Sequence, residues 1–141
     1  MAIKNYSTTI PAIRTAGEIE EILIEHDARN IQKNIEEKKI VGFSFLIDTP
    51  YGERLIRLPV NTQKALTVLR QNKKKNSGVK DTEEQAEKVA WRILKDWVDA
   101  QMALIEIEMV KMEEVFLPYT IIDNFGTTVY ERLEQTQLML P

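Results

Sequence analysis

The chain has 141 residues, of which 43% are hydrophobic and 29% charged, and a formal net charge of −3. These values are typical of one soluble globular domain, and they argue against a disordered chain and a general polyanion binder. The absence of cysteine excludes disulfide bonds and thiolate metal sites. No secretory signal and no apolar run long enough to cross a membrane are visible, so we expect a cytoplasmic protein.

The first elements in chain order are a strand and a helix. Residues 3–10 favour a strand closed by Pro11. Thr15 and Glu18 have the spacing of a capping box, which predicts the start of a helix. The inward stripe of this helix would comprise Ile19, Ile22, Leu23 and His26.

A three-stranded meander is expected next. Residues 30–35 and 40–47 are typical of a hairpin around the polar residues 36–39. Residues 48–53 predict a turn, and residues 54–60 predict the third strand. In the second strand, alternation places four apolar residues on one face: Val41, Phe43, Phe45 and Ile47.

Helices dominate the rest of the chain. Asn61 or Thr62 can cap a helix to about residue 72, and a basic loop spans residues 70–80. Thr82 opens a long helix that we expect to reach about Leu117, next to Pro118. Three further features complete the chain: a turn at 123–126, a capping box of Thr128 and Glu131 before a short helix, and an apolar tail at 137–141 suited to packing.

Together these elements predict one α+β domain over residues 1–141. Residues 1–75 would form a small, mostly antiparallel sheet of about four strands with helices. This half would pack against a long C-terminal helix in the helical half, residues 81–141.

The long helix has a charged stripe that includes Arg92, Asp96, Asp99 and Glu106. The charges exclude a membrane-spanning helix. Its apolar arc exceeds 180°, which means that the helix is either enclosed by the domain or shared with a partner subunit.

Gln101 and Glu108 interrupt that apolar arc. A buried carboxylate needs a cationic or hydrogen-bonding partner. Three interpretations stay open: a catalytic or ligand-binding site, a structural pair in which Glu108 meets Arg57 or Arg54, and an oligomer interface in which both residues fix the register.

Catalytic motifs are absent from the sequence. The single histidine, His26, is expected to interact with the end of the first helix. There is no glycine-rich phosphate loop and no nucleophile-elbow motif. Magnesium binding, as in all-helical nucleotide pyrophosphohydrolases, would need acids that here lie mostly on the solvated stripe: Glu83, Glu84, Glu87, Glu106, Glu108, Glu113 and Glu114. We therefore expect no cofactor and no metal.

The basic segment is the clearest binding signal. Its cations can contact a phosphate backbone, or they can form a solvated loop beside a helix end. The order helix, three strands, helix is that of double-stranded-RNA-binding domains, although their lysines lie at the start of the second helix. The candidate nucleic-acid-binding residues are Arg70, Lys73, Lys74, Lys75 and Lys80.

The block QAEKVAWRILKDWVDAQMALIEIEMVKMEEVFLPY, with TTIPAIRTAGEIEEILIEH and RLPV upstream, resembles small uncharacterised proteins encoded by bacteriophages and prophages of Gram-positive bacteria. The resemblance covers most of the chain and assigns no catalytic residue. It implies a phage protein in the cytoplasm of the host, expressed with replication or recombination functions.

Our leading hypothesis is a phage accessory protein without catalysis that contacts DNA or RNA through its basic loop. The alternative is a protein-interaction module that self-associates, or binds a host factor, through the long helix. A magnesium-dependent enzyme is the third hypothesis.

Overall fold

The computed structural model describes residues 2–136, which form an α+β fold with three antiparallel strands in the order β1-β2-β3. The sheet consists of β1 (Arg29–Glu36), β2 (Lys39–Thr49) and β3 (Gly52–Arg57). The helical elements are α1 (Ala12–Glu25), α2 (Thr62–Lys75), α3 (Glu83–Glu106), α4 (Met112–Val115), the 3-10 turn η1 (Leu117–Tyr119) and α5 (Val129–Thr136).

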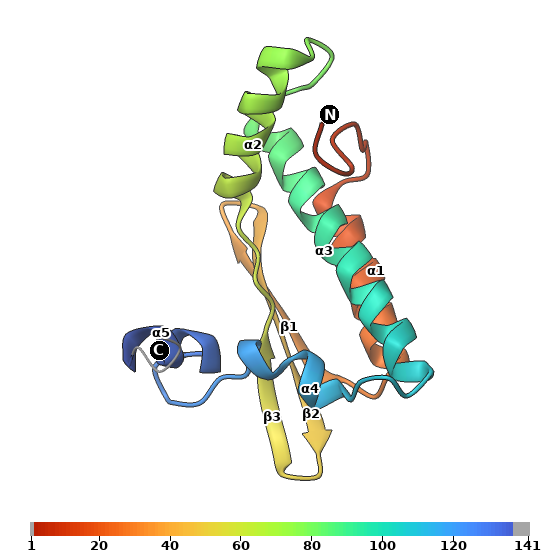
Figure 1. Cartoon of the computed structure of the whole chain (residues 1–141), viewed down its shortest axis with the longest axis vertical. Helices are drawn as coiled ribbons and strands as arrows, with labels where there is room; N and C mark the ends of the chain where they lie inside the picture. Colours follow the sequence, from red (N-terminus) through yellow and green to blue (C-terminus); the bar gives the residue numbers. More distant parts are fainter. Residues whose placement is uncertain (1, 137–141) are drawn as a thin grey trace.

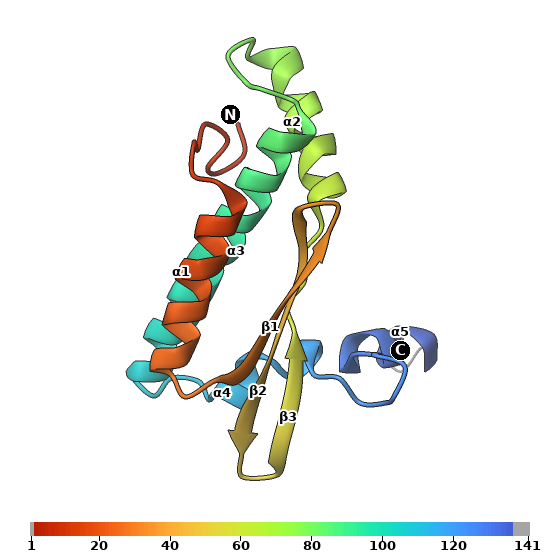
Figure 2. The ribbon, with the colours of Figure 1, turned by 180° about the vertical axis from the view of Figure 1, so that it is seen from behind.

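Helices α1 and α3 lie side by side along one face of the sheet (Figure 1). They run in the same direction, because Glu18 pairs with Arg92 near their middles and His26 contacts Glu106 at their ends. Helix α2 packs against α3, and α5 lies on the other side of the sheet from α1 and α3 in both views (Figures 1 and 2).

Two apolar clusters hold these layers together. The larger one lies between α1, α3 and the sheet, where Phe43, Phe45 and Trp91 are fully buried. Phe116 belongs to the same cluster, and the centroid of its ring is 5.3 Å from that of Phe45 and 5.8 Å from that of Trp97. The smaller cluster joins α2 to the first half of α3: Ala65, Leu66, Leu69, Val79, Ala86 and Val89.

The prediction of a first strand at residues 3–10 is wrong. This segment forms turns, with Asn5 in the left-handed region at φ 64°. The amide of Gln85 on α3 donates to the backbone oxygens of Tyr6 and Thr8, at 2.9 Å each. The described residues therefore hold three strands rather than four, and the N-terminal segment binds to α3 rather than to the sheet.

The end of α3 is also corrected. The helix stops at Glu106, not near Leu117, so it is central in the chain rather than C-terminal. Glu108 is left-handed at φ 61°, its N–H donates to Ile105, and the N–H of Met109 donates to Leu104. These bonds are those of a Schellman motif, which terminates a helix by satisfying its last carbonyls. The chain then turns back, which brings Phe116 into the core.

Alternation in β2 is shifted by a bulge. Asn34 pairs with Gly42 but Ile35 pairs with Ile40, so Val41 is an extra residue on β2. Val41 is therefore exposed and Ile40 is buried, whereas Phe43, Phe45 and Ile47 keep the predicted buried face.

Several local predictions are confirmed. Asn61 caps α2 by accepting a bond from the N–H of Lys64, and Thr82 caps α3 by accepting from that of Gln85. Thr128 and Glu131 bond each other's backbone N–H groups, as a capping box requires. The predicted tail at residues 137–141 lies outside the described residues.

Candidate interaction surfaces

The first candidate surface lies on α2. The helix extends to Lys75, so four of the five predicted basic residues are helical rather than part of a loop, and only Lys80 follows the helix. Lysines in the last turn are favourable there because the C-terminus of a helix carries partial negative charge. The cluster is therefore held on a rigid element that its own charges stabilise.

The basic residues of this region are not equivalent. Lys73 donates to the backbone oxygen of Val79 at 3.3 Å and lies 3.7 Å from a carboxylate oxygen of Asp81, so it fastens the loop after α2. Arg70, Lys74 and Lys75 are exposed and form no ion pair within the described residues. We call Arg70, Lys74, Lys75 and the likewise unpaired Lys80 the basic face.

Cations on other parts of the surface are commonly neutralised. Lys39 pairs with Glu87 at 3.2 Å, Lys95 pairs with Asp99 at 2.7 Å, and Arg92 pairs with Glu18. Residues 54–80 contain no Asp or Glu, although the whole chain has an excess of acids. This segment therefore carries a net positive charge in a chain that is acidic as a whole, and most of its cations have no ion pair among the described residues.

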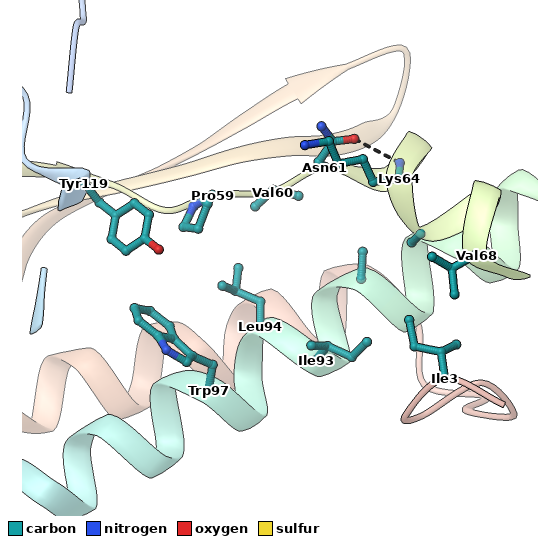
Figure 3. Close-up of a pocket in the computed structure, with 12 residues that line it drawn as sticks. Ile3, Pro59, Val60, Asn61, Lys64, Val68, Ile93, Leu94, Trp97 and Tyr119 are labelled. Carbon is teal, nitrogen blue, oxygen red and sulfur yellow. Dashed lines mark hydrogen bonds between the residues drawn. The ribbon is translucent and has the colours of Figure 1, made fainter. Parts of the chain in front are cut away.

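The second candidate surface is an apolar groove of about 430 Å³ between α3 and the connection from β3 to α2 (Figure 3). Trp97 and Tyr119 form one end, with ring centroids 5.8 Å apart, and Ile3 and Val68 lie at the other. The full lining is Ile3, Pro59, Val60, Asn61, Lys64, Ala65, Val68, Ala90, Ile93, Leu94, Trp97 and Tyr119.

The ends and the rim of the groove are fixed by polar contacts. The backbone N–H of Ile3 donates to the side-chain oxygen of Asn72 at 2.7 Å, which ties the N-terminal segment to α2. Asn61 accepts from the backbone N–H of Lys64 at 3.1 Å, which fixes the start of α2 beside the groove (Figure 3). Lys64 is the single charged residue in the lining, so the groove is apolar with a positive edge.

The wide apolar arc of α3 is mostly enclosed by its own domain. Trp91, Leu94, Val98 and Met102 are buried against α1 and the sheet, and Val89 is buried against α2. Ile93 and Trp97 are only partly buried, and both face the groove. Any partner of α3 would therefore meet the groove rather than a whole helix face.

Gln101 and Glu108 do not form a buried polar site. Gln101 is half-buried, and Glu108 is exposed on the turn that ends α3. Arg57 is bonded elsewhere: it donates to the backbone oxygen of Gly126 at 2.7 Å and to Glu131 at 2.9 Å. Arg54 donates to the backbone oxygens of Glu53 and Tyr51, so neither arginine forms the structural pair with Glu108 that was one of the three interpretations. Helix α3 ends at Glu106, which leaves Glu108 on the exposed turn.

His26 lies at the end of α1, as expected. Its Nδ1 is 2.9 Å from the backbone oxygen of Ile22, and its Nε2 is 3.2 Å from a carboxylate oxygen of Glu106. The ring thus joins the ends of α1 and α3 and has no second histidine beside it.

The carboxyl groups with displaced pKa values lie in turns and ion pairs. Hydrogen bonds from Thr127 hold the pKa of Asp123 below its usual value, and hydrogen bonds from Thr128 do the same for Glu131, with Arg57 adding to the effect. The Arg29 guanidinium lowers the pKa of Asp48. These environments stabilise charged side chains near water, which is a structural role rather than that of a proton donor.

Among residues 2–136, no group of three or more potential ligands is arranged to hold a metal ion. The same residues include no helix that is both long and apolar enough to span a membrane. The order α1-β1-β2-β3-α2 agrees with that of double-stranded-RNA-binding domains, but α2 rests on α3 and most of its cations lie in its last turns rather than at its start. That similarity is therefore one of element order.

Sequence reasoning located the basic residues but missed the groove. Its lining comes from the N-terminal segment, the connection after β3, α2, α3 and η1. Comparison with known protein families, curated proteins and solved structures finds no match to this chain.

Proposed function

We propose that this protein binds the phosphate backbone of nucleic acid through the basic face of α2, without catalysis. The observation that carries the proposal is that Arg70, Lys74 and Lys75 are exposed on one helix without ion-pair partners in the described structure. Free cations on a rigid element can replace the counterions of a polyanion, and the release of those counterions drives association.

The arrangement supports backbone contact rather than the reading of a base sequence. The basic face offers point charges, and positioning contacts to phosphate carry no sequence information themselves. The resemblance to phage proteins would assign this activity to an accessory protein of replication or recombination. DNA and RNA duplexes of the same sequence, tested side by side, would identify the preferred nucleic acid.

The experiment compares two variants that each remove one Arg and one Lys. Arg70→Gln with Lys74→Gln alters the basic face, while Arg14→Gln with Lys38→Gln alters two other exposed cations without ion pairs in the described part of the chain. Glutamine is a good helix former, and Lys73 is retained because it anchors the following loop.

Affinity for a short duplex is measured by fluorescence anisotropy over a range of salt concentrations. The slope of log K against log salt is negative, and it should become less steep by about 2 in the first variant, since each lost phosphate contact removes about 0.9 from its magnitude. The second variant should keep the slope of the unmodified protein. Equal slopes for both variants would overturn the proposal.

A protein-interaction module is the second candidate function, and the apolar groove is the observation that favours it.

A further inference from the structure

The molecule has an exposed apolar segment that matches its apolar groove in chemistry. The segment, which we call the C-terminal arm, spans residues 122–136 and includes α5. The side chain of Phe125 is 94% exposed, and Ile122 and Tyr130 are each 45% exposed. Large apolar side chains gathered in one exposed segment commonly mark an interaction site.

The arm makes few contacts with its own domain. Helix α5 has no buried residue, and its main contact is with η1. It is held by the capping box of Thr128 and Glu131, by the bonds from Arg57 to Glu131 and to the backbone oxygen of Gly126, and by the backbone bond from Val129 to Thr120. A helix of eight residues is not stable alone in water, so further packing would strengthen it.

The charges of the two surfaces are complementary. Asp123 of the arm pairs with Arg132 and Glu131 pairs with Arg57, so Glu134 is the acidic residue of the arm that has no ion pair among the described residues. The groove has Lys64 on its rim and no acidic residue in its lining, and α2 contains no acid. The exposed carboxylate of Glu134, in the same segment as exposed apolar side chains, therefore suits an apolar groove with one lysine in its lining.

The arm does not occupy the groove of its own chain, because α5 and α3 lie on opposite sides of the sheet (Figures 1 and 2). We infer that the groove receives the C-terminal arm of a second copy of the chain, with Phe125 as the apolar anchor and Glu134 directed to Lys64. The groove, at about 430 Å³, has the size of sites that enclose small apolar groups.

The arm and the groove are different surfaces of the molecule. When the arm of one copy fills the groove of a second, the groove of the first copy and the arm of the second remain free. Reciprocal exchange fills both and closes a twofold dimer, whereas one-way docking would give a ring or a filament. The reciprocal dimer uses two copies of each contact. It is formed without nucleic acid and uses neither Arg70 nor Lys74, so it stands independently of the proposed function.

The test is the mass of the protein by analytical ultracentrifugation over a concentration series, without nucleic acid. We expect a dimer whose dissociation constant rises on the order of tenfold or more in Phe125→Ser. The control is Tyr51→Ser, since Tyr51 is 77% exposed on the turn between β2 and β3 and belongs to neither surface. Both substitutions change exposed side chains and leave the core intact.

A charge exchange tests the pairing itself. Lys64→Glu should weaken the dimer, and adding Glu134→Lys in the same chain should restore it. Mixing Phe125→Ser, which keeps its groove, with Lys64→Glu, which keeps its arm, should give a heterodimer held by one contact. A monomeric unmodified protein at millimolar concentration, or an unchanged dimer in Phe125→Ser, would overturn the inference.

Discussion

Replacement of Thr15 by valine should raise the free energy of unfolding. Thr15 lies inside α1 with no exposed surface, and its hydroxyl has no hydrogen-bond partner among the described residues. A buried hydroxyl without a partner costs about 1–3 kcal/mol, because it loses its bonds to water and gains none. Valine has nearly the same shape and a similar helix propensity, so the change removes this cost without opening a cavity.

We expect a gain of about 1–2 kcal/mol, which is part of the full desolvation penalty. For a chain of this size, that corresponds to a rise in melting temperature of about 3–7 °C. Thr15→Ser is the control, since it keeps the hydroxyl and removes the methyl group. It should lower the free energy of unfolding by about 1 kcal/mol.

The free energy of unfolding of both variants is measured by urea titration monitored by circular dichroism. An unchanged slope m shows that the substitution does not alter the surface exposed on unfolding. A loss of stability in Thr15→Val, with little change in Thr15→Ser, would refute the reasoning. That result would mean that the hydroxyl makes a bond in solution, for example to a buried water molecule.

Two further predictions concern the end of α3 and the C-terminal arm. Glu108→Gly should raise the free energy of unfolding by about 0.5–1 kcal/mol in a urea titration, since glycine adopts φ 61° without strain, whereas Glu108→Val should lower it. Equal stabilities in the two variants would contradict the left-handed turn. The arm should loosen in acid. The pKa values of Asp123 and Glu131 are lower in the folded state than in the unfolded state. The two carboxylates therefore stabilise the folded arm above their unfolded pKa values, near 4, and this stabilisation is lost as the pH falls through their folded pKa values. Carbon chemical shifts of residues 129–136 should therefore lose helical character as the pH falls below about 4, and unchanged shifts would show that these carboxylates do not hold the arm.

The two capping boxes show why local patterns succeed in one place and fail in another. Thr128 and Glu131 bond each other's backbone N–H groups at the start of a short helix, as their spacing predicts. Thr15 and Glu18 have the same spacing, but α1 begins one turn earlier, at Ala12 after Pro11. Tertiary packing decides the difference, because α1 buries Thr15 and Glu18 reaches Arg92 on α3.

Periodicity predicted the hairpins and most of the core but not its interruptions. The alternation of β2 correctly placed Phe43, Phe45 and Ile47 inside. The bulge at Val41 leaves no composition signal, since both Ile40 and Val41 are apolar. The end of α3 was equally hidden, because residues 103–110 contain neither glycine nor proline, and a glutamate occupies the left-handed position that glycine usually fills.

Of the two candidate surfaces, the basic residues could be predicted from the sequence and the groove could not. A run of lysines is polar whatever the fold, so its exposure followed from sequence alone, whereas its position on α2 rather than in a loop did not. The groove depends on where the connection after β3 and the turn η1 cross α3, and that crossing is a property of the chain path. The wide apolar arc of α3 did predict one feature correctly, namely that this helix packs against more than one neighbouring element. Three elements, α1, α2 and the sheet, satisfy most of that requirement, and the strip between Ile93 and Trp97 is what they leave. An arc wider than one packing face therefore indicated that several elements of the domain pack around α3, and the groove lies in the gap between them.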